Sequence, residues 1–101
     1  MTINKNQTAD KLILMLEGRL DTITAPLLEA EISIIGQEVP LLELNLNKLE
    51  YLSSAGLRVI LATHKKMAPP RSMVITGVNE TIMEVFEITG FSDILTIDKG
   101  E

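Results

Sequence analysis

The chain has 101 residues, 46% of them hydrophobic, which suits one small domain, and its lack of cysteine excludes disulfides, thiolate nucleophiles and cysteine-based zinc sites. The net charge of −5 and the scattering of the nine basic residues argue against direct nucleic-acid binding. Because there is no signal-peptide pattern and no apolar run near the ~20 residues of a membrane span, we expect a soluble, cytoplasmic protein without membrane insertion.

The N-terminal segment predicts a β-hairpin. Residues 12–16 are five apolar residues in a row, which favours a short central strand covered on both faces rather than a helix. Residues 2–7 are expected to form a weaker edge strand. Residues 8–10 form the turn between the two strands, although they lack the favoured Asn-Gly or Asp-Gly pair.

A helix and a third strand follow. Thr24 is a capping candidate and Pro26 stands in the first turn, where no backbone N–H is required, so a helix is expected to start here. Gly36 marks its expected end. Residues 42–46 then alternate between leucine and polar residues, which predicts a strand with one buried face.

The second half of the chain repeats this strand and helix pattern. Helical spacing of apolar residues predicts a helix over 54–67, which the following proline pair must end. Residues 73–75 predict a short strand, and Asn79 is expected to cap a third helix that closes at Gly90. Residues 94–97 are expected to form the last strand.

The expected fold is therefore a single α/β domain over residues 1–101 with the order β-β-α-β-α-β-α-β. Successive strand-helix-strand units favour parallel neighbours and right-handed crossovers, and the N-terminal hairpin supplies an antiparallel pair. We expect a mixed sheet of four to five strands, about three main helices and a frayed end over 98–101.

The residues do not predict an enzyme. The one histidine, His64, lies on the apolar spacing of its helix, which favours a structural role over that of a general base. There is no Gly-x-Ser-x-Gly motif and no phosphate-binding glycine loop. With no cysteine and one histidine, neither a metal site nor a cofactor is expected, and we predict no catalytic residue.

Two polar positions are predicted to share one edge of the sheet. Asp21 follows one central strand, and the serine pair Ser53-Ser54 follows the next. One serine suffices as a helix cap, which leaves the other free. Ala55 and Gly56 keep the first turn small, so that a bulky group or another backbone can approach.

These segments together resemble the STAS domain family, the fold of bacterial anti-sigma factor antagonists. "GRLDTITAPLLEA" resembles the family's Gly-x-Leu-Asp turn into the first helix. "LLELNLNKLEYLSSAGLRVIL" is similar to its central strand and switch loop, and "VFEITGFSDILTI" to its C-terminal helix and strand. The resemblance covers nearly the whole chain and implies a single STAS-like domain.

The resemblance also implies a function. An unphosphorylated antagonist binds an anti-sigma factor serine kinase and frees the sigma factor; phosphorylation weakens that complex, and a metal-dependent serine phosphatase restores it. In phosphorylated members the switch loop reads Asp-Ser-Ser-Gly-Leu or Asp-Ser-Ala-Gly-Leu, which puts the acceptor at Ser54, with Ser53 as second candidate. The residues expected to bind the partner are Asp21, Thr22, Ser53, Ser54, Ala55, Gly56 and Arg58.

One departure from the family pattern keeps an alternative open. The residue before the expected acceptor is Ser53 instead of aspartate. Some STAS domains act without phosphorylation, as scaffolds or as subunits of lipid-transport assemblies that bind a cytoplasmic ATPase. That role is the alternative to partner switching.

Overall fold

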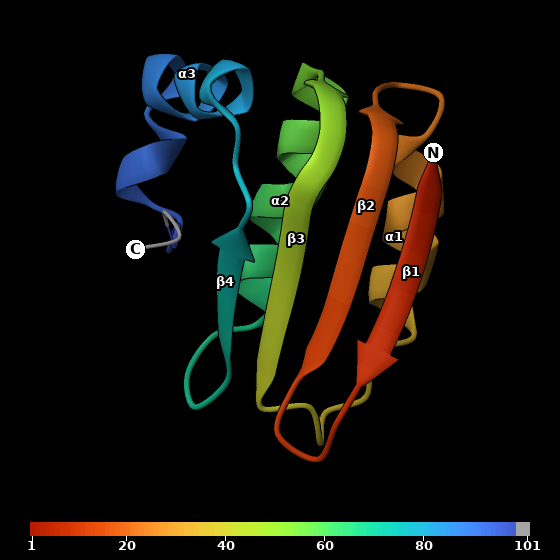
Figure 1. The fold of residues 1–101 in the computed structure, drawn as a ribbon. Coiled ribbons are helices and arrows are strands. Elements are labelled where there is room, and N and C mark those ends of the chain that lie inside the picture. The colour runs from red at the N-terminus through yellow and green to blue at the C-terminus, as the bar shows by residue number, and fades with distance from the viewer. Residues whose placement is uncertain (99–101) are drawn as a thin grey trace.

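The structure, a computed structural model, describes residues 1–98 as four strands, three α-helices and one 3₁₀ turn (Figure 1). The expected frayed end lies mostly outside the described residues, at 99–101. The strands are β1 (Thr2–Gln7), β2 (Leu12–Leu20), β3 (Leu41–Leu52) and β4 (Ser72–Thr76). The helices are α1 (Ala25–Ser33), α2 (Ser54–Lys66) and α3 (Glu80–Thr89), followed by the turn Phe91–Asp93.

The strands form one mixed sheet in the order β1-β2-β3-β4. β1 pairs antiparallel with β2, while β2 with β3 and β3 with β4 are parallel. The predicted mixed α/β sheet, with the N-terminal hairpin as its antiparallel part, is thus confirmed. So is the one-sided strand over 42–46, because Leu42, Leu44 and Leu46 are fully buried.

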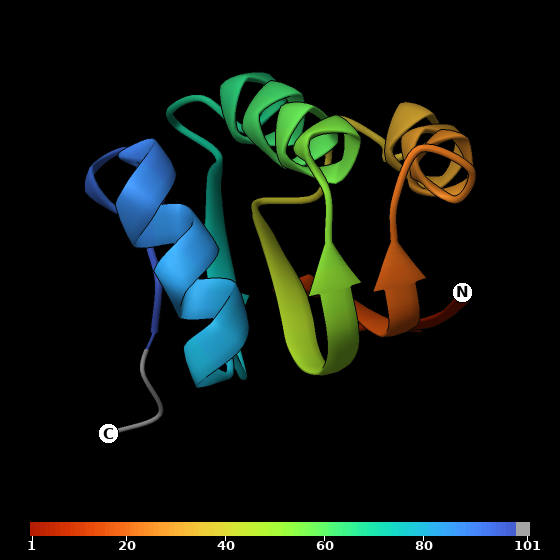
Figure 2. The same ribbon diagram turned by 90° about the horizontal axis from the view of Figure 1, so that it is seen from above.

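The helices α1 and α2 both cover the same face of the sheet (Figure 2). The expectation that residues 12–16 are covered on both faces is therefore wrong: Leu14 is fully buried, whereas Met15 beside it is 37% exposed. The reason is handedness. The crossovers β2-α1-β3 and β3-α2-β4 step across the sheet in the same direction, so right-handed connections bring both helices to one side.

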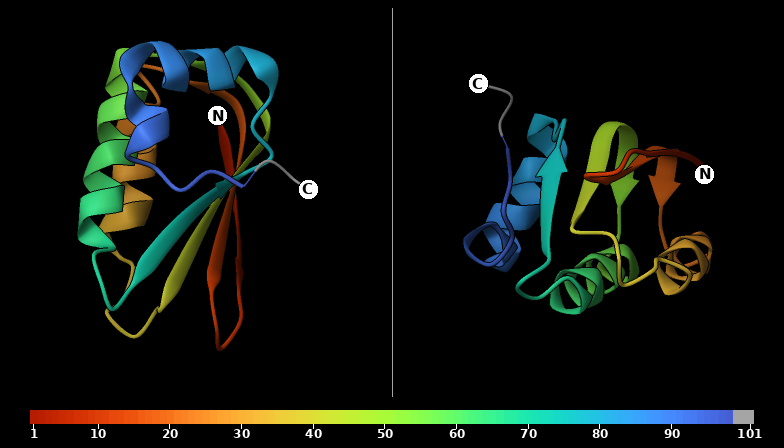
Figure 3. Two further views of the ribbon diagram at one scale, coloured as in Figure 1. Left: turned by 90° about the vertical axis from the view of Figure 1, so that its left-hand side faces the viewer. Right: turned by 90° about the horizontal axis from the view of Figure 1, so that it is seen from below.

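The third helix lies across the C-terminal end of β4 (Figure 3). Asn79 caps it as predicted, because its side-chain oxygen accepts the Ile82 N–H at 2.8 Å. The same side chain donates to the Leu49 carbonyl of β3 at 3.1 Å, which ties the helix to the sheet. The helix ends at Gly90 in the left-handed conformation (φ +80°), also as predicted.

The predicted last strand over 94–97 is wrong as an element. Only Ile97 pairs with the sheet, in one parallel bridge to Ile75. Two hydrogen bonds hold it, from Ile75 N to Thr96 O (2.9 Å) and from Asp98 N to Ile75 O (2.8 Å). β4 is only five residues long, and the chain leaves the sheet directly after it at Gly77, which has φ +68°. The outer edge of β4 therefore offers few positions at which another strand can pair.

Candidate functional site

The candidate site lies where β2 and β3 end and the helices α1 and α2 begin (Figure 1). Leu20 and Leu52 are the last paired residues of these strands. The Ser53 N–H donates to the Leu20 carbonyl at 2.9 Å, so the two chains are still in contact as they leave the sheet. The structure therefore brings Asp21 and the serine pair to one edge of the sheet, as the sequence predicts.

The two serines at this edge stand in different environments. Ser53 is extended (φ −95°, ψ 173°) and is the N-cap of α2, because its hydroxyl accepts the Gly56 N–H at 3.4 Å. Ser54 is the first residue of the helix and is exposed. Within residues 1–98 its hydroxyl makes no hydrogen bond, so it is open to a reagent from solvent.

Gly56 serves the core instead of the surface. It is buried, and a Cβ atom on it would lie 2.7 Å from Cγ of Leu20 and 2.8 Å from Cδ1 of Leu52. The small residue is required because the first turn of α2 packs directly on these two leucines. Gly56 is thus required for packing inside the domain, and its expected contact with a partner stays a prediction.

Asp21 organises the loop that leads into α1. Its Oδ1 accepts the backbone N–H groups of Ile23 and Thr24, both at 3.0 Å. The hydrogen bond from the Thr24 N–H holds the pKa of the Asp21 carboxyl below its usual value. Thr24, expected to cap α1, makes no capping bond; its hydroxyl instead accepts the Asp21 N–H (2.8 Å) and donates to the Arg19 carbonyl (2.7 Å).

An exposed cation stands beside this loop. The guanidinium of Arg19 lies 4.1 Å from the ring centre of Tyr51, its partner across the strands, and its Nε is 3.7 Å from Oδ2 of Asp21. This pair is not among the residues predicted from the sequence. The sequence pattern that could have predicted it is the strand alternation. Each of the two residues directly precedes a buried leucine, so its side chain points to the other face of the sheet, away from the core.

A groove of about 430 Å³ runs between α1 and α2 from this edge. Three predicted partner-binding residues line it, namely Thr22, Ala55 and Arg58. The groove was not predicted from the sequence, although the residues of both its walls follow helical spacing. The other lining residues are Ala25, Pro26, Glu29, Val59 and Ala62.

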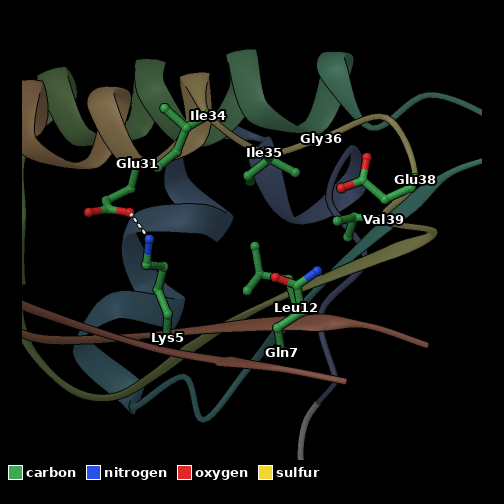
Figure 4. Close-up of a pocket in the computed structure, with 9 residues that line it drawn as sticks. All are labelled: Lys5, Gln7, Leu12, Glu31, Ile34, Ile35, Gly36, Glu38 and Val39. Carbon is green, nitrogen blue, oxygen red and sulfur yellow. Dashed lines mark ion pairs between the residues drawn. The ribbon is translucent and has the colours of Figure 1, made fainter. Parts of the chain in front are cut away.

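A second pocket, of about 230 Å³, lies at the opposite end of the sheet (Figure 4). Leu12, Ile35 and Val39 give it a buried apolar floor, and none of the predicted site residues lines it. Across its mouth the ammonium of Lys5 meets the carboxylate of Glu31 at 2.9 Å. Because this pair joins β1 to α1, we assign it a structural role.

The described residues show no catalytic arrangement at Ser54. His64 lies ten residues further along α2, about 15 Å by helical rise, too far to act as its base. His64 is half-buried, and its Nδ1 has no hydrogen-bond partner in the described part of the chain.

Among residues 1–98 no cluster of three metal-ligating side chains occurs. No helix in that range is long and apolar enough to cross a membrane.

Comparison with known proteins gives a family model, described as STAS domain, that matches residues 2–101. The Anti-sigma-B factor antagonist of Listeria monocytogenes is 29% identical over 99 residues, which cover 96% of this chain and 87% of the relative.

Two solved structures share the fold. An anti-sigma factor antagonist from Mycobacterium paratuberculosis has a TM-score of 0.86 and 23% identity over 95% of this chain and 83% of that chain. The Bacillus cell fate determinant SpoIIAA in its phosphorylated form has a TM-score of 0.74 and 19% identity over 98% of this chain and 93% of that chain.

Proposed function

Because this chain belongs to the STAS domain family, we propose that it is an anti-sigma factor antagonist that acts by partner switching. In its unphosphorylated form it binds an anti-sigma factor serine kinase, which then releases the sigma factor. The name of the Listeria relative, which aligns with nearly the whole chain, supports this role. The protein is then a ligand and a substrate, not an enzyme, and needs no cofactor of its own.

The observation that carries the proposal is the exposed Ser54 hydroxyl at the first position of α2. The kinase transfers the γ-phosphoryl group of ATP to Oγ of Ser54; the hydroxyl proton leaves and ADP is the other product. A metal-dependent serine phosphatase later hydrolyses the ester with water and returns the free hydroxyl. The structure of SpoIIAA in a phosphorylated form supports a phosphorylated state for this fold.

The phosphate changes the surface more than the fold. It adds about −1.5 to −2 charges at pH 7. Negative charge at the N-terminus of a helix is favourable, and Ser54 is exposed, so that a phosphate on it extends into solvent. A partner seated over the same edge meets this charge beside the Asp21 carboxylate. The complex should therefore weaken although the domain stays folded.

Affinity capture from the host tests the proposal. The wild-type chain and the Ser54→Ala variant should capture a serine kinase, and Ser54→Asp should capture at least tenfold less. With ATP and Mg²⁺ the captured kinase should phosphorylate the wild type and the Ser53→Ala control, but not Ser54→Ala. Equal capture by Ser54→Asp, together with no phosphate at Ser54, would refute partner switching.

One observation favours the alternative, a non-phosphorylated STAS subunit or scaffold, for example in a lipid-transport assembly with a cytoplasmic ATPase. Ser53 stands where phosphorylated members carry aspartate. In this structure, however, Ser53 caps α2, and serine and aspartate are equally good caps. The replacement therefore preserves the start of the helix and removes only a charge. Capture of a transport ATPase in place of a kinase would establish the alternative.

A further inference from the structure

We propose that Arg58 is the internal partner of the phosphate on Ser54, with which it forms an ion pair on the surface of α2. This inference rests on the phosphorylation proposed above. Ser54 and Arg58 are both exposed residues of α2, four positions apart. Arg58 also lines the groove between α1 and α2, so its position links the phosphorylation site to the candidate docking surface.

The spacing brings the two groups together. Side chains four residues apart lie on the same face of a helix, and long side chains lean back toward the N-terminus. The guanidinium of Arg58 can thus reach the first turn, where Ser54 lies. An acid that precedes a base by four residues is the more favourable order of such a pair. A guanidinium can also donate two parallel hydrogen bonds to one phosphate, which a lysine cannot.

Arg58 is also available. Within residues 1–98 its guanidinium takes part in no hydrogen bond or ion pair. The other cation at this edge, Arg19, already stacks on Tyr51 and faces the Asp21 carboxylate. Glu29 lines the same groove as Arg58, yet the two form no ion pair within 4.0 Å. A phosphate with nearly two charges attracts Arg58 more strongly than this single carboxylate does.

The pairing gives phosphorylation a second effect on the surface. In the unphosphorylated protein Arg58 belongs to the wall of the groove. When it turns toward the phosphate, the groove loses its cation while the adjacent edge gains an anion. Two effects then weaken the binding of a partner with an acidic group over the groove: the phosphate repels that group, and Arg58 no longer attracts it.

Phosphorus NMR tests the proposal. The sample is the full chain with phosphoserine at position 54, inserted during translation. The second pKa of the phosphate should be lower with Arg58 than in Arg58→Gln by roughly half a pH unit, which is about 0.7 kcal/mol at 1.36 kcal/mol per unit. Arg58→Lys should restore part of the shift. Lys65→Gln is the matched control: it removes the same charge about 16 Å along the helix, where salt screens it.

A second measurement needs no substitution. The Nε–Hε signal of Arg58 in the wild-type chain should move when Ser54 carries phosphate, and that of Arg71 should not. Equal titration of the phosphate in the Arg58→Gln and Lys65→Gln variants, or an unmoved Arg58 signal, would overturn the role of Arg58. Neither NMR measurement uses a kinase, so a negative result in them leaves the proposal of partner switching intact. Conversely, if Arg58 lowers the pKa of the phosphate but the captured kinase never modifies Ser54, only partner switching is overturned.

Discussion

Alanine at Ser53 should destabilise the fold, whereas alanine at Ser54 should not. Loss of an N-cap side chain costs about 0.5–2 kcal/mol. The Ser53 bond to Gly56 N is 3.4 Å long, against 2.8 Å for the cap that Asn79 forms on α3, so we expect about 0.5–1 kcal/mol. Ser54 is the first residue of the helix and its hydroxyl is unbonded, so alanine there should change the stability by no more than about 0.5 kcal/mol.

Urea unfolding followed by circular dichroism measures this difference. The Ser53→Ala and Ser54→Ala variants should differ by about 1 kcal/mol, or roughly 4 °C in Tm for a domain of this size. Ser53→Asp should regain the lost stability, because aspartate is an equally good cap and its charge suits the helix N-terminus. If Ser54→Ala proves as destabilising as Ser53→Ala, the assignment of Ser53 as the cap and Ser54 as the free hydroxyl is wrong.

Two further predictions concern the same edge of the sheet. Gly56→Ala should lower the free energy of unfolding by about 1 kcal/mol in urea, since crowding Leu20 and Leu52 costs about 1–3 kcal/mol and helix propensity returns about 1 kcal/mol. A gain in stability would contradict the packing. Asp21→Asn should lower stability at pH 7, and this deficit should shrink as pH falls below about 3.9, because the lowered pKa makes the carboxylate stabilising only while it is ionised. A deficit independent of pH would refute that cause.

The candidate site was largely predictable because its signals are local. Serine before an apolar helical pattern predicts the start of α2, and Asn79 and Gly90 predict both ends of α3. Each depends on hydrogen bonds within a few residues of the chain. The shared edge of Asp21 and the serines follows from one topological rule, since neighbouring parallel strands end on the same side of the sheet.

The sequence by itself determined the three helices, the alternating strand over 42–46 and the position of Ser54, because these depend on contacts between near neighbours along the chain. Only the tertiary structure decided which face of the sheet is covered, and hence that Met15 is exposed. It also decided that Gly56 packs on leucines of β2 and β3, that Arg58 lines a groove between two helices, and that Ile97 pairs alone. These features depend on crossover handedness and on contacts between distant segments, which no local pattern encodes.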